Sequence, residues 1–184
     1  MVKFIVMQNV FDHIASAIKE TKAHIVLIGG FAVNYYGVSR HTADVDFLTS
    51  EKDYALIFNF LKKFQYSELV RNRLFARVSS TTAEFDLDFL FTKTDTLNGI
   101  FKAGRKVKIA NHSFTVPSLL HLIALKVHSW KQEPGTREYR DFSDIVELVR
   151  RNKLHVKTKK FQDIFLKYGT KEFYDKVVKA SNTK

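Results

Sequence analysis

The sequence predicts an α+β protein, with a small mixed sheet flanked by helices and a helical C-terminal part. Three observations lead to this class. Short apolar runs bounded by turn residues recur between residues 24 and 116, apolar residues at helical spacing lie before and between them, and every apolar pattern after residue 117 is helical. We therefore expect residues 1–116 to form a core domain and residues 117–184 to form a helical region packed on it.

The expected elements of the core mix helices and strands. Apolar side chains at Val10, Phe11, Ile14 and Ile18 predict an amphipathic helix over residues 8–21. The run at 51–64 has helical spacing with acids at its start, which suits the helix dipole. The polar turn STTA separates two β runs and predicts that they are antiparallel neighbours. The remaining expected elements are a strand at 24–29, a brief helix at 30–37 that ends at Gly37, a strand at 43–49, the β runs at 74–80 and 83–91, and a hairpin strand at 106–116.

The C-terminal region carries four helical patterns. Pro117 opens the first of them, over 117–131, because proline is tolerated in the first turn of a helix. A loop at 132–138 ends this helix. Further helices are expected at 139–151, 158–169 and 171–180.

Composition narrows the class of protein. The chain has 184 residues, 45% of them hydrophobic, which is enough for one packed core. It has no cysteine, which excludes disulfides and thiolate metal sites and agrees with a reducing cytoplasm. The N-terminal apolar run is too short for a signal peptide, and nowhere do 18 apolar residues run together. We expect a soluble cytoplasmic protein with no membrane partner.

Charge is concentrated near the C-terminus. The formal net charge is +11, and the 35 residues from Arg150 to Lys184 hold 11 Lys and Arg against 3 acids. A basic surface of this kind suits a polyanion such as RNA, because lysine and arginine displace counterions from phosphates. A solvated helical face that keeps the protein soluble explains the same composition equally well.

Two pairs of carboxylates carry the chemical signal. Asp44 and Asp46 alternate on one expected strand, and Asp86 and Asp88 alternate on another, so each pair points to one face of the sheet. Adjacent carboxylates repel unless a cation holds them, and Mg²⁺ is the hard cation that prefers oxygen ligands shared with phosphates. An edge strand with one wet face is the alternative for either pair alone.

Gly29 and Gly30 lie where a strand hands over to a helix, which is a place where exposed amides can receive a phosphate. A tight turn that needs small residues is the alternative. The combination of this glycine pair with carboxylates on the following strand and on a later strand favours metal-assisted phosphoryl chemistry.

These motifs together resemble the signature of the nucleotidyltransferase (polymerase-β-like) fold. The match comprises an apolar strand ending in G-G, a spacer of 13 residues from Gly30 to Asp44, the D-x-D of "SRHTADVDFL", and a later acid in "FDLDFL". The segment "LIALKVHSWKQEPGTREYRDFSDIVEL" is similar to the lysine helix and the R-D-x-x-D helix of the AbiEii/AbiGii-type branch, the abortive-infection and type IV toxin nucleotidyltransferases.

The resemblance implies roles for individual residues. Asp44, Asp46 and a third acid would hold two Mg²⁺ ions; Asp88 is preferred as the third, with Asp86 as the alternate. Gly29 and Gly30 would contact the phosphates of an NTP. Arg40 and Thr42 match an R-x-T motif that precedes the D-x-D, and they would contact the nucleotide. Lys126 would reach the triphosphate. One acid of the next helix would also contribute to the nucleotide site, and the motif does not choose between Asp141 and Asp144. Lysine covering the edge of the core is the alternative for Lys126.

The resemblance also implies an activity, which is transfer of NMP from an NTP to an acceptor hydroxyl with release of pyrophosphate. The basic C-terminal helices favour RNA, tRNA-like in the toxin branch, as the acceptor, and an antitoxin protein is a possible partner. Two alternatives stay open: nucleotide transfer to an antibiotic or a protein, and a non-catalytic module of the same fold that binds nucleic acid.

Overall fold

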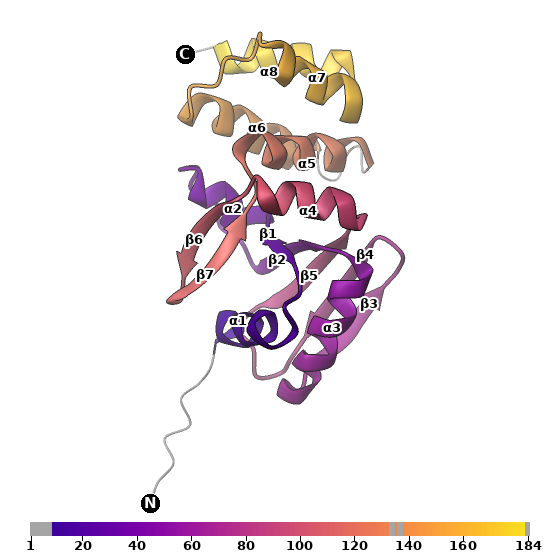
Figure 1. Cartoon of the computed structure of the whole chain (residues 1–184). Helices are drawn as coiled ribbons and strands as arrows, with labels where there is room; N and C mark the ends of the chain where they lie inside the picture. Colours follow the sequence, from indigo (N-terminus) through magenta and orange to yellow (C-terminus); the bar gives the residue numbers. More distant parts are fainter. Residues whose placement is uncertain (1–8, 133–134, 136–137, 183–184) are drawn as a thin grey trace, which may run out of the picture. The chain divides into compact units, whose positions relative to one another are not determined.

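The computed structural model describes residues 9–132, 135 and 138–182, and its secondary structure is drawn in Figure 1. Five strands form a mixed sheet in the order β1-β2-β5-β4-β3, in which β2 and β5 run parallel and the other neighbours antiparallel. Two more strands form a separate hairpin. The strands are β1 (Ile25–Leu27), β2 (Asp44–Thr49), β3 (Ser67–Arg71), β4 (Phe75–Ser79), β5 (Asp86–Phe91), β6 (Arg105–Ile109) and β7 (His112–Val116).

One face of the five-stranded sheet is apolar, because side chains alternate along each strand. Phe47 of β2 and Phe89 of β5 are fully buried on this face and stack with ring centroids 5.7 Å apart. Tyr54 of α3 (Glu51–Leu61) packs on Phe89 at 5.1 Å. Loss of one such buried ring typically costs about 3–5 kcal/mol. The apolar face therefore fixes β2 and β5 side by side and directs their aspartates to the opposite face.

Capping residues define the helices that accompany this sheet. α1 (Val10–Thr21) begins with a capping box, in which Asn9 and Asp12 each accept a hydrogen bond from the other's backbone amide. The hydroxyl of Ser50 accepts from the amide of Asp53 at the start of α3. A short 3₁₀ turn, η1 (Lys62–Phe64), follows α3, and α4 (Thr94–Lys102) contacts β1 and β2.

The chain divides into two compact units. Unit 1 contains residues 1–31 and 42–116, and unit 2 contains residues 32–41 and 117–184. The first passage between the units falls inside α2 (Gly29–Tyr35). The other helices of unit 2 are α5 (Leu119–Gln132), α6 (Glu138–Arg151), α7 (Lys159–Tyr168) and α8 (Lys171–Asn182).

Unit 2 has an aromatic core of its own. Its helix α5 contacts α6 and α7, and α8 contacts the same two helices. Phe161, Phe165 and Phe173 lie between them, each with at most 1% of its surface exposed. The ring of Phe165 lies 5.1 Å from that of Phe161 and 5.6 Å from that of Phe173.

The structure confirms the expected α+β class and most of the expected elements, including the antiparallel pairing of β4 with β5. The strand β3 and the helix α4 were not anticipated. Pro117 lies before α5 instead of in its first turn, since the helix begins at Leu119. The start of the expected 8–21 helix and most of the 132–138 loop lie outside the described residues. The expected packing of the C-terminal region on the core stays a prediction.

Within the described part of the chain, no helix combines the length and apolarity needed to cross a bilayer.

Candidate active site

The aspartates of β2 and β5 lie in register across the sheet. Because the two strands are parallel, Asp44 is opposite Asp86 and Asp46 is opposite Asp88. Alternation then places all four on the face that does not carry Phe47. Carboxylate oxygens of Asp44, Asp46 and Asp88 lie within 4.8 Å of one another, and we call these three residues the acidic cluster.

The donor set of the acidic cluster fits a hard divalent cation. All three ligands are carboxylate oxygens, and separations below 4.8 Å let one ion contact several of them. Asp88 is buried, while Asp44 and Asp46 are half-buried, so the cluster combines a fixed ligand with access from solvent. Asp86, the alternate third ligand, is not in this group of the described residues. The geometry thus groups Asp88, and not Asp86, with Asp44 and Asp46.

An arginine that the sequence patterns do not single out contacts the acidic cluster. Arg77 of β4 is directly opposite Asp88 in the antiparallel pairing. Its Nε donates to Asp88 Oδ1 at 2.7 Å and its Nη2 donates to Asp88 Oδ2 at 2.5 Å, while Nη2 lies 3.6 Å from Asp44 Oδ2. The hydrogen bonds to Asp88 hold the pKa of Arg77 above its usual range, and the charges of Asp88, Asp44 and Asp86 act in the same direction. Arg77 is therefore a permanent cation at this site.

The glycine pair lets the backbone approach the acidic cluster closely. Gly29 has φ +61°, and a Cβ on it would lie only 1.8 Å from Oδ2 of Asp46. A Cβ on Gly30 would lie 2.6 Å from Cβ of Thr42. The hydroxyl of Thr42 in turn donates to Asp44, at 3.0 Å to its carbonyl and 3.1 Å to Oδ1. Both glycines are thus required for tight packing against the residues around the dyad.

A second set of charged residues lies in unit 2. Lys126 of α5 donates to Asp141 Oδ1 at 3.1 Å and to Asp144 Oδ2 at 2.5 Å, and Arg40 Nη1 donates to the same oxygen of Asp144 at 2.9 Å. We call Arg40, Lys126, Asp141 and Asp144 the ion-pair cluster. The side chains of Lys126 and both aspartates have less than a tenth of their surface exposed. Both acids contact Lys126, so the geometry does not select one of them.

Asn34 of α2 positions Arg40, and sequence reasoning missed it. Its Nδ2 donates to the carbonyl of Arg40 at 2.9 Å, and its Oδ1 accepts from the Arg40 amide at 2.7 Å. These two hydrogen bonds fix the backbone of Arg40, and the guanidinium reaches Asp144 from that position. A single asparagine in a polar stretch carries no pattern by which the sequence signals this contact.

Comparison with known families decides the class of the protein. A family model described as "Nucleotidyl transferase of unknown function (DUF2204)" matches residues 7–177. The chain belongs to the DUF2204 nucleotidyl transferases. The expectation of a nucleotidyltransferase enzyme is thereby confirmed. No curated protein sequence is significantly similar to this DUF2204 chain.

Several solved structures resemble the DUF2204 chain in fold. The antibiotic-resistance factor ANT(2″)-Ia, in complex with adenylyl-2″-tobramycin, matches with TM-score 0.61 at 12% identity, over 86% of this chain and 97% of that one. An antigenic nucleotidyltransferase-like protein from Paracoccidioides brasiliensis matches with TM-score 0.54 at 14% identity, over 90% and 88%. The lincosamide antibiotic adenylyltransferase LnuA, with lincomycin bound, matches with TM-score 0.51 at 13% identity, over 73% and 92%.

At these identities the likeness shows the fold, and it confirms the expected nucleotidyltransferase fold for the DUF2204 chain. These likenesses do not distinguish the abortive-infection branch, so that finer assignment stays a prediction.

Proposed function

We propose that the acidic cluster is the catalytic centre of a Mg²⁺-dependent transfer of NMP from an NTP to an acceptor hydroxyl. The observation that carries this proposal is the convergence of Asp44, Asp46 and Asp88 to within 4.8 Å beside a glycine whose backbone touches Asp46. Asp88 is the preferred third ligand because it belongs to this cluster and Asp86 does not.

The chain's own residues supply positioning and charge. The three aspartates would hold two Mg²⁺ ions, and bound magnesium lowers the pKa of an acceptor hydroxyl and offsets the charge of a triphosphate. The acceptor oxygen forms a bond to the α-phosphorus as the bond to pyrophosphate breaks, so no covalent enzyme intermediate is needed. Thr42 holds Asp44 in place through its hydroxyl, and Gly29 leaves room for the carboxylate of Asp46.

Further nucleotide contacts rest on the family resemblance. Gly29 and Gly30 would face the phosphates, and Arg40, Thr42 and Lys126 would contact the nucleotide. In the structure Arg40 and Lys126 both donate to Asp144, so their cationic groups already have anionic partners. Nucleotide binding by these two residues requires a phosphate to compete with Asp144.

RNA is the acceptor that the charge distribution favours. The 16 Lys and Arg of unit 2 outnumber its 8 Asp and Glu, whereas unit 1 has 14 against 11. Between Leu148 and Gln162 there is no acid. Six cations of this stretch are exposed to solvent. One of them, Arg150, pairs with Glu147, and we call the other five the basic segment: Arg151, Lys153, Lys157, Lys159 and Lys160. A run of exposed cations without acids matches the phosphate backbone of a nucleic acid.

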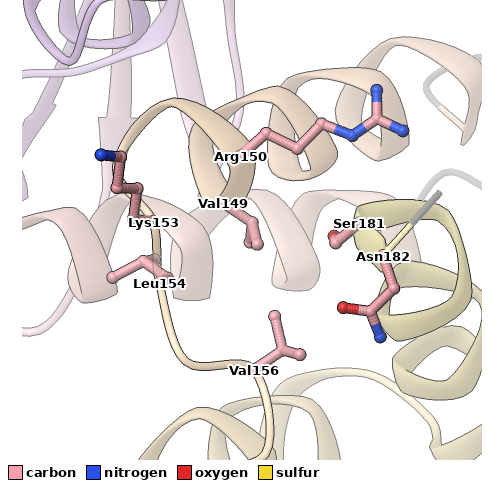
Figure 2. A pocket seen from close by; sticks show the side chains of 7 residues that line it. All are labelled: Val149, Arg150, Lys153, Leu154, Val156, Ser181 and Asn182. Atoms are coloured by element: carbon pink, nitrogen blue, oxygen red, sulfur yellow. The ribbon is translucent and has the colours of Figure 1, made fainter. Parts of the chain in front are cut away.

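The basic segment adjoins a hollow of about 410 Å³ in unit 2. Figure 2 shows the side chains of Val149, Leu154 and Val156 lining it from α6 and the segment that follows, opposite Ser181 and Asn182 at the end of α8. The lining also includes the cations Arg150 and Lys153, so the hollow offers apolar side chains for a nucleobase beside positive charges for a phosphate. Together, the hollow and the basic segment would contact a base as well as the phosphate backbone of an RNA strand.

An antibiotic acceptor is the second candidate. It is favoured by the structural likeness to ANT(2″)-Ia and LnuA, which are described as an antibiotic-resistance factor and an antibiotic adenylyltransferase. A small-molecule acceptor makes no use of the basic segment, so substitutions there separate the two candidates.

The test is transfer of α-³²P-labelled nucleotides in the presence of Mg²⁺. Each of the four NTPs is offered with total RNA, with a protein fraction or with aminoglycoside and lincosamide antibiotics. We expect label in RNA with the natural chain and none with Asp46→Asn. Charge reversal at Lys157, Lys159 and Lys160 should reduce labelling of RNA and leave Mn²⁺ binding by the acidic cluster unchanged. Label in the antibiotics and none in RNA would replace the first candidate by the second, and no label in any fraction would contradict the proposed activity.

A toxin role is the finest level of the proposal and is supported by the similarity of residues 122–148 to the abortive-infection branch. It predicts that expression of the natural chain arrests bacterial growth, that Asp44→Asn relieves the arrest, and that an antitoxin protein binds the natural chain. Normal growth on expression would exclude this role while leaving nucleotidyl transfer intact.

A further inference from the structure

Arg77 is a charged residue that contacts the acidic cluster and that the proposed reaction does not use. Its guanidinium is bound through two nitrogens to both oxygens of Asp88 and also lies 3.6 Å from Asp44. Asp88 itself is almost inaccessible, with 7% of its side chain exposed. The buried ligand of the site therefore reaches a cation only by sharing its oxygens with Arg77 or by exchanging Arg77 for that cation.

The local charge is unbalanced in a defined way. Three carboxylates within 4.8 Å carry three negative charges, and Arg77 carries one positive charge, so the cluster retains a net charge of about −2 when its acids are ionised. One divalent ion neutralises that remainder. Asp86 lies opposite Asp44 on the same face of the sheet, and of the three aspartates that attract the Arg77 guanidinium it has the weakest effect.

We propose that Arg77 is an internal counter-ion of the acidic cluster, which limits the nucleotide-free protein to one divalent ion and leaves a second ion to arrive with the triphosphate. This inference rests on the proposed function, since it concerns the same site. It assigns Arg77 a positioning and charge-balancing role and no contact with the reacting atoms.

The geometry and the exposure of Arg77 allow a metal ion to displace its guanidinium from Asp88. Its side chain is 38% exposed, so the guanidinium can move into solvent without losing a buried environment. Its bidentate contact is the strongest geometry available between arginine and a carboxylate, so it competes with a metal ion for Asp88. Its charge also repels an incoming cation at a distance of a few ångström, an effect that solvent weakens but does not remove.

The two ion positions should therefore fill at different stages. The first ion cancels the net charge of the acidic cluster and Arg77 together, and a second ion would then meet little negative charge beyond that of Asp86. The triphosphate of an NTP brings about four negative charges, which restores the attraction for the second ion. Under this scheme the complete metal site forms only when substrate is bound.

The experiment is a titration with Mn²⁺, followed by the electron paramagnetic resonance signal of free Mn²⁺, on protein without nucleotide. The variants are Arg77→Gln, which removes the charge, and Arg77→Lys, which keeps it. Arg73→Gln is the matched control, because Arg73 is an exposed arginine in the neighbouring β3–β4 turn and its loss changes the net charge equally. Asp46→Asn defines the background.

The natural chain should bind one Mn²⁺ without nucleotide and two with a non-hydrolysable ATP analogue. Arg77→Gln should bind the first Mn²⁺ about 10-fold more tightly, since a neighbouring positive charge is gone. Arg77→Lys and Arg73→Gln should stay within about threefold of the natural chain. The rise in melting temperature on adding Mn²⁺ should also be larger in Arg77→Gln, because tighter binding to the folded state stabilises it more.

Three results would overturn the role of Arg77. These are unchanged or weaker Mn²⁺ binding in Arg77→Gln, a Lys variant that behaves like the Gln variant, or two equal Mn²⁺ sites in the natural chain without nucleotide. In each case Mn²⁺ binding above the Asp46→Asn background would still support the proposed metal site. If the natural chain shows no binding above that background even with the ATP analogue, the proposed function itself fails.

Discussion

The acidic cluster of unit 1 and the ion-pair cluster of unit 2 use the same residue types to opposite effect. In the first, Asp44, Asp46 and Asp88 outnumber one cation, Arg77, and the group is partly open to solvent. In the second, two aspartates meet two cations, and Lys126 with its acids is buried. An excess of negative charge that solvent can reach is available to a ligand, whereas a balanced and buried set of charges mainly fixes the elements that carry it.

Substitutions in the two clusters should also affect the stability of the fold differently. Neutralising a carboxylate of the acidic cluster relieves repulsion, so the fold should tolerate it. Removing one member of the ion-pair cluster leaves a buried charge without its partner, which is among the most destabilising changes a core can suffer. Activity should therefore be sensitive to the first cluster and stability to the second.

Asp44→Asn should give the largest effect and should act on activity alone. We expect nucleotidyl transfer to fall at least about 1,000-fold, as for loss of a metal ligand or of comparable charge stabilisation. The free energy of unfolding should fall by less than about 0.5 kcal/mol or rise, because one of three adjacent negative charges is removed. Asp163→Asn, at an exposed position of α7, is the control for net charge. Substantial nucleotidyl transfer by Asp44→Asn would contradict the proposal that Asp44 is a metal ligand of the active site.

Lys126→Met should give the largest change in stability. It removes the cation that Asp141 contacts and leaves Asp144 with Arg40, and we expect the free energy of unfolding in urea to fall by about 3–5 kcal/mol. Lys131→Met, an exposed position on the same helix, should change stability by less than about 0.5 kcal/mol. A stable Lys126→Met protein that binds nucleotide less tightly would instead favour the nucleotide contact that the family resemblance gives Lys126, and it would break the contrast between the clusters.

Gly29→Ala should have a smaller effect, on both properties. The new Cβ meets the carboxylate of Asp46 and the backbone has φ +61°, so we expect a loss of about 1–3 kcal/mol in stability and weakened Mn²⁺ binding. Gly37→Ala is the matched control, because Gly37 has φ +84° and a Cβ added there would meet no atom of the described residues within 4 Å. It should lose about 1 kcal/mol and bind Mn²⁺ normally. Equal Mn²⁺ binding in the two variants would show that Asp46 does not depend on the space above Gly29.

Sequence patterns were sufficient where a residue's role depends on its own strand. Alternation on β2 and β5 fixes the face of Asp44, Asp46 and Asp88, and the D-x-D spacing marks them. They were insufficient for Arg77, because its contact with Asp88 depends on the register between β4 and β5, which no local pattern encodes.

The two elements that the sequence did not reveal have weak patterns for physical reasons. β3 is an edge strand whose five residues are all exposed, so no alternation between apolar and polar positions distinguishes it. α4 is short and contains Gly99, which has a low helix propensity, so its local sequence is a poor helix former although Leu97 and Ile100 lie at helical spacing.

The passage of residues 32–41 into unit 2 bears on the order in which the protein can be completed on the ribosome. Arg40 finds its partner at Asp144, and the carbonyl of Tyr36 accepts a hydrogen bond from Asn152 at 3.1 Å. The stretch that joins Gly30 to Thr42 therefore stays without these anchors until Asn152 has been synthesised. A nascent chain that stops earlier, even one that contains every aspartate of the acidic cluster, should be released as an inactive fragment.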